Sequence, residues 1–298
     1  MNALYQEQLQ RITKALTFLP DKPEETPDST LRALWFTAAG SPRSAEAALQ
    51  GELPALDDAG RARLQGFLVR RLAGEPLAHI TGRQRFVGME MLAGPGALVP
   101  RRETELLARA AVELARGVAA TGGPVRVVDV CTGSGNVALA VAHHVPEARV
   151  SGADLSEEAV ALARLNAEHL GLAPRVEFRA GDLLAPFDTA EFHGTVDVLS
   201  CNPPYISSAK VEQMHGEISK YEPRLAFDGG AFGVNILMRL LQDAPRFIKP
   251  GGWLAFEVGL GQGPAMAKRL EKTGHFRDLR LHNDENGAPR ALCARFQR

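Results

Sequence analysis

The first 80 residues of the chain place apolar side chains at helical spacing and show no strand-like alternation. Two stretches break this pattern, Pro20–Pro27 and Gly40–Pro42. The pattern predicts helices over roughly 4–18, 29–38, 43–49 and 57–73. We therefore expect residues 1–80 to form an N-terminal helical domain.

The last of these helices is amphipathic. Asp57 or Asp58 can cap its start, and its apolar residues fall on one face. Its arginines fall largely elsewhere, and we expect them to form a solvated face and not a nucleic-acid surface: Arg61, Arg63, Arg70 and Arg71.

Beyond residue 80 the pattern changes. Ile80–Val99 alternates in short pieces around glycines, which predicts a β-hairpin linker over 81–100. From Glu103 a helix leads into strands that alternate with helices, the pattern of a parallel sheet with right-handed crossovers. Phe276–Leu281 and Ala291–Phe296 predict an antiparallel pair at the end. We expect residues 101–298 to form one α/β domain.

The most informative stretch, Asn202-Pro203-Pro204-Tyr205, follows the buried strand expected over Val196–Cys201. Two prolines cannot continue a sheet, so the chain must turn sharply there. The Asn202 oxygen and the Pro203 carbonyl can accept the two hydrogens of a planar NH₂ group while Tyr205 packs on its face. Alone, the stretch also fits a proline-stiffened turn with an Asn cap.

A second motif lies upstream. A β-branched strand ends near Asp129, and the loop Cys131-Thr132-Gly133-Ser134-Gly135 leads into a helix beginning near Asn136. Glycines let a ligand approach the backbone, and the helix start offers free N–H groups. The loop also fits a dinucleotide fingerprint, so it is a weak signal by itself.

Acidic residues follow the next two strands. Asp154 ends the strand that begins at Ala148 and can hold the hydroxyls of a ribose. Asp182 and Leu183 follow Val176–Ala180 and suit an adenine edge and face. A nicotinamide enzyme would have no need for the Asn-Pro-Pro-Tyr turn, whereas S-adenosylmethionine beside an NH₂-bearing acceptor explains all these elements. Here the chain resembles the class I methyltransferases that act on planar nitrogen.

Composition narrows the possible partners and location. The chain has 298 residues and a net charge of −1, with 34 basic against 35 acidic residues, so we expect no stable nucleic-acid binding. Three cysteines are too few for a disulfide framework and suggest a reducing, cytoplasmic location. No apolar run approaches the roughly 20 residues of a membrane span, the polar start does not resemble a signal peptide, and no metal-ligand spacing occurs.

Several stretches together resemble the family of glutamine-amide methyltransferases that modify peptide-chain release factors, with relatives acting on a ribosomal protein. They are Gly74–Gly82, Leu98–Glu105, Asn202–Tyr205, Tyr221–Ala226 and Gly287–Arg290, and the likeness covers about residues 55–298. The resemblance implies a Rossmann-like, mostly parallel seven-stranded sheet joined by the hairpin to an N-terminal helical domain for substrate recognition. It implies S-adenosyl-L-methionine as cofactor and a release-factor Gly-Gly-Gln glutamine as acceptor.

Three positions depart from the family pattern. Arg102 replaces the usual Pro, Cys131 replaces the first glycine of the loop as in the ribosomal-protein branch, and His79 stands where Tyr is common. A ribosomal-protein glutamine therefore stays open as an alternative acceptor. So does an exocyclic amine of a DNA or RNA base, because such enzymes use a similar turn.

The residues then take these expected roles. Asn202, Pro203, Pro204 and Tyr205 would be catalytic. The cofactor would be held by Cys131, Thr132, Gly133, Ser134, Gly135, Asp154, Asp182, Leu183 and Asn202. The substrate would be held by Asn202, Pro203, Tyr205 and Glu222. For Glu222 the alternative is a capped turn that supports Asn202–Tyr205, and Glu257 is either a supporting residue or a loop cap.

Overall fold

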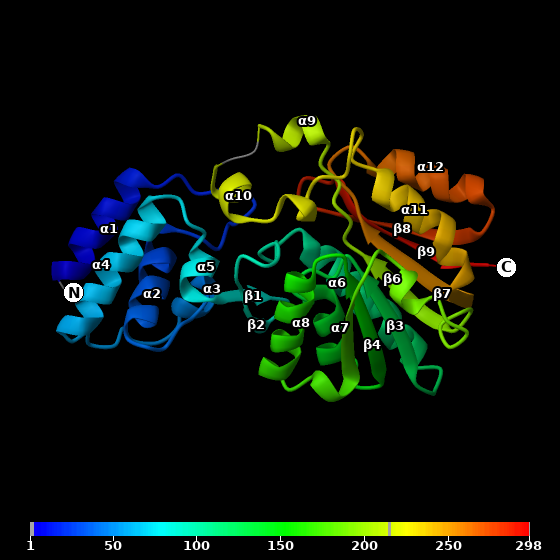
Figure 1. The fold of residues 1–298 in the computed structure, drawn as a ribbon, viewed down its shortest axis with the longest axis horizontal. Helices are drawn as coiled ribbons and strands as arrows, with labels where there is room; N and C mark the ends of the chain where they lie inside the picture. Colours follow the sequence, from blue (N-terminus) through cyan, green and yellow to red (C-terminus); the bar gives the residue numbers. More distant parts are fainter. Residues whose placement is uncertain (1–2, 214–215, 298) are drawn as a thin grey trace.

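The structure is a computed structural model that describes residues 3–213 and 216–297, and it places a helical unit beside an α/β unit (Figure 1). The helical unit contains α1 (Ala3–Ala15), α2 (Pro27–Ala38), α3 (Ala45–Ala48), α4 (Asp58–Leu72) and α5 (Leu77–Thr81). These helices share an apolar core of their own, in which Leu31, Trp35 and Leu64 are buried.

Local capping explains where these helices begin. Thr26 and Ser29 bond reciprocally at the start of α2, each side chain accepting from the other's backbone N–H at 3.1 and 2.8 Å. At α4, Asp57 Oδ1 accepts from Gly60 N at 2.6 Å, as the sequence predicts. The one-turn helix α5 was not predicted from the sequence.

A β-hairpin joins the two units through β1 (Arg83–Phe86) and β2 (Met89–Leu92), paired antiparallel. Its two turn residues, Val87 and Gly88, both have positive φ, at 45° and 82°. This geometry matches the right-handed twist of a tight hairpin. Val87 N donates to Glu105 Oε1 at 2.7 Å, which fixes the hairpin to the helix that follows.

The α/β unit is built on one seven-stranded sheet. Its strands are β3 (Val125–Val130), β4 (Ala148–Asp154), β5 (Val176–Ala180), β6 (Val196–Cys201), β7 (Ile248–Glu257), β8 (Phe276–Asn283) and β9 (Pro289–Phe296). Their order is β5-β4-β3-β6-β7-β9-β8, and β9 runs antiparallel to both of its neighbours. The predicted class I, Rossmann-like sheet is confirmed.

Seven α-helices accompany the described sheet: α6 (Thr104–Ala119), α7 (Asn136–His144), α8 (Glu157–His169), α9 (Ser208–Val211), α10 (Gly216–Tyr221), α11 (Asn235–Asp243) and α12 (Gly263–Thr273). Short 3₁₀ turns are η1 (Ala173–Arg175), η2 (Ala185–Phe187), η3 (Arg224–Ala226) and η4 (Ala244–Arg246).

Alternation along the buried strands sends side chains to two cores. Val125 and Val127 of β3 pack with α6, α7 and α8, whereas Val128 and Val130 pack with α11 and α12. Because β4 and β6 lie on opposite sides of β3, the strand order reverses there. A ligand crevice is expected at the carboxyl ends of these strands.

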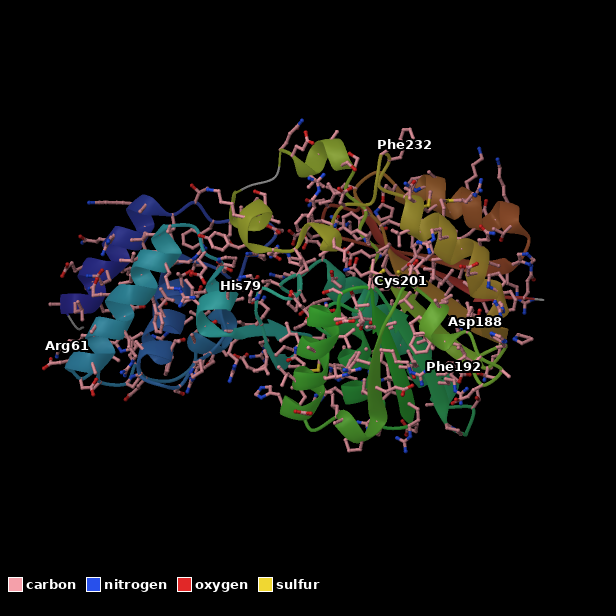
Figure 2. The ribbon with its side chains drawn as sticks, in the orientation of Figure 1. Arg61, His79, Asp188, Phe192, Cys201 and Phe232 are labelled. Carbon is pink, nitrogen blue, oxygen red and sulfur yellow. The ribbon has the colours of Figure 1, made fainter. Side chains whose placement is uncertain are left out.

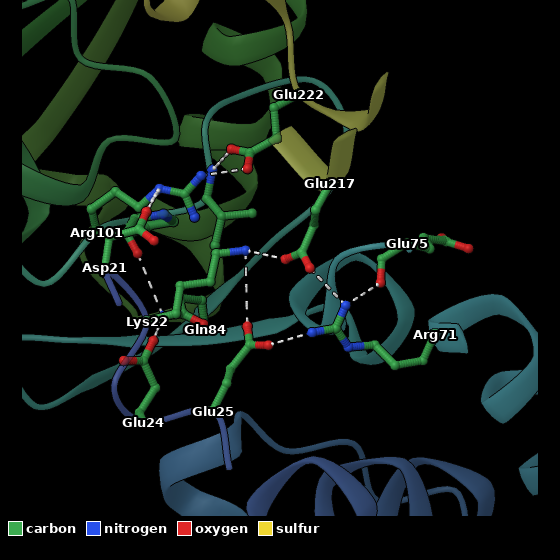
Figure 3. Close-up of polar contacts among 12 residues, drawn as sticks. Asp21, Lys22, Glu24, Glu25, Arg71, Glu75, Gln84, Arg101, Glu217 and Glu222 are labelled. Atoms are coloured by element: carbon green, nitrogen blue, oxygen red, sulfur yellow. Dashed lines mark hydrogen bonds and ion pairs between the residues drawn. The ribbon is translucent and has the colours of Figure 1, made fainter. Parts of the chain in front are cut away.

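One expectation about the helical unit is wrong. Arg61 is exposed at the outer edge of the helices, as expected (Figure 2), but Arg71 is only 2% exposed. Its guanidinium contacts two carboxylates, Glu25 Oε2 and Glu217 Oε2, each at 2.8 Å (Figure 3). Buried arginines are rare unless paired, and both partners are far from Arg71 in sequence.

Candidate functional site

The loop after β3 is held rigidly at the crevice. Asp129, buried at the end of β3, accepts hydrogen bonds from the Thr132 hydroxyl at 2.6 Å and the Ser200 hydroxyl at 2.7 Å. Burial raises the pKa of Asp129 to about 6, although these two hydrogen bonds act to lower it. The loop is thereby tied to β6, the strand that leads into Asn202.

Backbone conformation at this loop favours close approach of a ligand. Cys131 and Gly133 have φ of 56° and 55°, the left-handed region. Gly133 N donates to Asp154 Oδ2 at 2.8 Å and Ser156 N donates to Asp154 Oδ1 at 3.0 Å. Asp154 therefore joins the ends of β3 and β4 while each of its oxygens keeps a lone pair for a ligand.

A cavity opens along this edge of the sheet. It is lined by nearly all the predicted cofactor residues: Cys131, Thr132, Gly133, Ser134, Asp154, Asp182, Leu183 and Asn202. Ser134 Oγ is buried in its wall and has no hydrogen-bond partner among the described residues. A nucleoside with several polar groups fits this donor and acceptor set.

Two predicted cofactor residues have other contacts as well. Gly135 does not line the cavity; a Cβ there would lie 2.8 Å from Phe178, so packing and its φ of 84° explain the glycine. Asp182 lines the cavity, and its Oδ2 also pairs with Arg239 at 2.6 Å.

A second cavity lies on the other side of Asn202. Its walls include Asn202, Pro203, Tyr205, Glu257 and Arg290. Asn202 and Thr104 line both cavities. A group bound in the second cavity would therefore meet a group bound in the first beside the Asn202 side chain.

The Asn202–Tyr205 turn is fixed by several contacts. Asn202 Nδ2 donates to Thr104 Oγ1 at 3.1 Å, and the Tyr205 hydroxyl donates to Glu257 Oε1 at 2.9 Å. Gln262 Nε2 donates to the Tyr205 carbonyl at 3.1 Å. In the described part of the chain, the Pro203 carbonyl accepts no hydrogen bond.

Two glycines allow the backbone to pack against this turn. A Cβ on Gly229 would lie 2.4 Å from the Pro204 carbonyl, and one on Gly233 would lie 2.2 Å from the Tyr205 carbonyl. Neither glycine was singled out from the sequence, and nor was Gln262; Thr104 lies in the Leu98–Glu105 stretch that resembles the family, but no role was predicted for it. For Gly229, Gly233 and Gln262, only a three-dimensional contact distinguishes them from ordinary helix or loop residues.

Glu222 lies outside both cavities. Its Oε2 accepts from Val99 N at 3.0 Å and its Oε1 pairs with Arg101 at 2.5 Å, so both oxygens are directed at the protein and neither at a cavity. These contacts favour the alternative, that Glu222 supports the turn, over the predicted contact with substrate. Arg102, the departure from the family pattern, is exposed.

Comparisons with known proteins agree with this geometry. A methyltransferase-domain family matches residues 123–262. The release factor glutamine methyltransferase of Geobacter sulfurreducens is 37% identical over 79% of this chain and 78% of its own length. The enzyme of the same name from Bradyrhizobium diazoefficiens is 38% identical over 80% of this chain and 79% of its own.

The chain belongs to the release factor glutamine methyltransferase family. The resemblance read from the motifs is thus confirmed, as is S-adenosylmethionine as the cofactor of this methyltransferase family. A methyltransferase structure from Pyrococcus furiosus, 17% identical, superposes with a TM-score of 0.50 over 78% of this chain and 98% of that one, which supports the fold. Within the described ranges of this family member, no helix is long and apolar enough to cross a bilayer.

Proposed function

We propose that this chain transfers the methyl group of S-adenosylmethionine to the side-chain amide nitrogen of the glutamine in the Gly-Gly-Gln loop of peptide-chain release factors. The observation that carries the proposal is the position of Asn202 between two cavities, with its Nδ2 bonded to Thr104. The Asn202 oxygen is then left to accept a hydrogen from an acceptor amide. The names of the curated relatives support release factor as the acceptor.

The first cavity would hold the cofactor. Asp154 would accept hydrogen bonds from the ribose hydroxyls, Leu183 would pack on the adenine, and Asp182 would accept from its edge. The Cys131–Gly135 loop would follow the amino-acid part of the cofactor, with Ser134 as a polar partner. When bound, S-adenosylmethionine supplies an electrophilic methyl group on a sulfonium.

Replacing Asp154 by alanine should weaken S-adenosylmethionine binding by about 1.5–3 kcal/mol, the range for hydrogen bonds to a charged group. Calorimetric titration with the cofactor measures this loss. Asp154→Asn is the matched control, because an amide retains an acceptor for the Gly133 N–H that Asp154 holds at 2.8 Å. A folded alanine variant with undiminished affinity would remove Asp154 from the ribose site.

The second cavity would orient the acceptor. A carboxamide nitrogen is a poor nucleophile because its lone pair is delocalised into the carbonyl. Acceptance of its two hydrogens by the Asn202 oxygen and the Pro203 carbonyl raises the electron density on nitrogen and aims it at the methyl group. Good alignment of the reacting groups can lower the activation free energy by about 7–11 kcal/mol. Tyr205, fixed through its hydroxyl, would hold the plane of the amide. The methylated nitrogen is far more acidic and can lose its proton to water.

Residues 1–80 would form the part that recognises the folded partner. Their buried charges reach across to α10, whose Ile218 lines the second cavity. Contacts made by the helical unit with a release factor could therefore orient the glutamine loop for transfer, so that remote binding energy is used at the reacting atoms.

Mass spectrometry after incubation with S-adenosylmethionine tests the proposal. We expect intact release factor to gain one CH₂ unit on the Gly-Gly-Gln glutamine. A large-subunit ribosomal protein and a DNA or RNA duplex serve as parallel acceptors. Methylation confined to the ribosomal protein would show that this protein, and not the release factor, is the acceptor. Methylation of nucleic acid alone would overturn the proposal.

A further inference from the structure

Thr104 lies between two side chains of the second cavity, Asn202 and Glu257. It begins α6 and is only 2% exposed. Its Oγ1 accepts from Asn202 Nδ2 at 3.1 Å. Glu257 lines the same cavity as Thr104, and the Thr104 and Tyr205 hydroxyls oppose the rise that burial causes in the pKa of its carboxyl group. Three elements distant in sequence thus meet at one hydroxyl.

Glu257 is the buried carboxylate next to Thr104 and Tyr205. It is 1% exposed at the end of β7, and its Oε1 accepts from the Tyr205 hydroxyl at 2.9 Å. Its Oε2 is enclosed and meets no described donor in good hydrogen-bond geometry, so the neighbouring Thr104 hydroxyl proton is needed there. A buried carboxylate oxygen without a donor is costly.

The direction of these hydrogen bonds determines what Asn202 presents to a ligand. A threonine hydroxyl has one proton to donate and two lone pairs. Because an ionised carboxylate only accepts, the Thr104 proton points to Glu257 and its lone pair faces Asn202. The Asn202 group that faces Thr104 must then be the NH₂, which leaves the Asn202 oxygen for the acceptor cavity.

We propose that Glu257 is a positioning residue for methyl transfer: through Thr104 it fixes which way the Asn202 amide faces, and through its own carboxylate it fixes the Tyr205 hydroxyl. The inference rests on the proposed function, because it deepens the account of how the acceptor amide is oriented. With the Asn202 amide reversed, its NH₂ would face the NH₂ of the acceptor, and neither could accept.

We call the proposed series of contacts from Glu257 through Thr104 to Asn202 the relay, and protonation of Glu257 would disrupt it. Burial raises the pKa of Glu257 to about 7, while contacts with Thr104 and Tyr205 and the positive charge of Arg290 oppose the shift and Glu103 adds to it. These groups come from the start of α6 (Thr104) and the residue before it (Glu103), the turn after β6, and β9. A protonated Glu257 can donate to Thr104, so kcat should fall as the pH falls through about 7.

Two isosteric changes test the relay. In Glu257→Gln, the glutamine oxygen accepts from the Tyr205 hydroxyl, so the glutamine NH₂ faces Thr104. The Thr104 hydroxyl must then accept from the glutamine and donate to Asn202, which reverses the relay. In Thr104→Val, the hydroxyl is absent. We expect each to lower kcat on release factor by about 100-fold, with KM and cofactor affinity within about 3-fold. Thr104→Ser keeps the hydroxyl, and its kcat should stay within about 3-fold of the wild-type value. The acidic limb of the pH profile should disappear in Glu257→Gln.

A second readout is independent of the acceptor. The side-chain NH₂ signal of Asn202 in a nitrogen-15 NMR spectrum, assigned by its loss in Asn202→Ala, should shift and exchange faster in Thr104→Val but not in Thr104→Ser. The relay would be overturned by a near wild-type kcat in Thr104→Val, or by a loss of kcat in Thr104→Ser equal to that in Thr104→Val. It would also be overturned by an Asn202 NH₂ signal that is unchanged in Thr104→Val. Wild-type protein that fails to methylate release factor would overturn the proposed function, and the NMR comparison would still decide the relay.

Discussion

Replacing Asn202 by alanine is expected to reduce kcat by roughly 10²–10³-fold, the cost of removing one preorganised polar group that acts in a transition state. The side chain of Asn202 is held by Thr104 at 3.1 Å and lies where the two cavities meet. Alanine removes the oxygen that would accept from the acceptor nitrogen. Initial rates on release factor, measured at saturating cofactor, give the change in kcat.

Cofactor affinity separates this effect from damage to the nucleoside site. S-adenosylmethionine binding should stay within a few-fold in Asn202→Ala, because Asp154 and the loop after β3 are untouched. Asp154→Ala should show the opposite pattern, with weakened cofactor binding. If Asn202→Ala methylates at a near wild-type rate, Asn202 only shapes the turn, and the proposed orientation of the acceptor amide by its side-chain oxygen is wrong.

The sheet and the loop after β3 could be predicted from the sequence because their signals are local. Val125–Val130 is β-branched and buried on both faces, and the glycines that follow require left-handed backbone. The Asn202–Tyr205 turn was equally readable, because two prolines after a buried strand allow few conformations. In each case the informative residues are neighbours along the chain.

The remaining contacts of the site could not be predicted, because they join residues far apart in sequence. Thr104 and Asn202, for example, are 98 positions apart. Arg71 stands three residues after Leu68 and seven after Leu64, so helical spacing places it on the apolar face of α4, where an arginine is buried only if it finds partners. Whether such a residue is exposed or buried depends on Glu25 and Glu217, which α4 alone does not reveal. For Glu222 the sequence left two readings, and its partners, Arg101 and Val99 N, favour support over substrate contact.

Replacing Arg71 by alanine is expected to lower the free energy of unfolding by about 3–5 kcal/mol, the cost of breaking a buried ion pair by removing one partner. Glu25 and Glu217 would then share Lys22, which lies 3.9 and 2.6 Å from them. Denaturant unfolding measures the loss. Arg70→Ala is the matched control: Arg70 is the adjacent residue, and its side chain is 44% exposed in a pair with Glu75, so we expect a loss below about 1 kcal/mol.

The loss should depend on pH in a defined direction. Burial already raises the pKa of Glu25, although the charges of Lys22 and Arg71 oppose the shift, and removing Arg71 raises this pKa further. A carboxyl whose pKa is higher in the folded than in the unfolded state stabilises when protonated, and that stability is lost as pH rises through the folded pKa. The deficit of Arg71→Ala should therefore widen from about pH 5 to about pH 8. A deficit that is constant over this range would contradict the account.

Arg71 also tests whether the helical unit helps to place the acceptor. It joins α4 to Glu217 of α10, the helix whose Ile218 lines the second cavity (Figure 3). We expect Arg71→Ala, assayed where it is fully folded, to raise KM for release factor while cofactor affinity stays within a few-fold. Adding Glu25→Gln should recover part of the stability, because it removes a buried carboxylate that has lost its Arg71 partner and leaves Lys22 to Glu217. It should not restore KM, because the Arg71–Glu217 pair remains broken. Recovery of both quantities together would show that Arg71 only stabilises the fold.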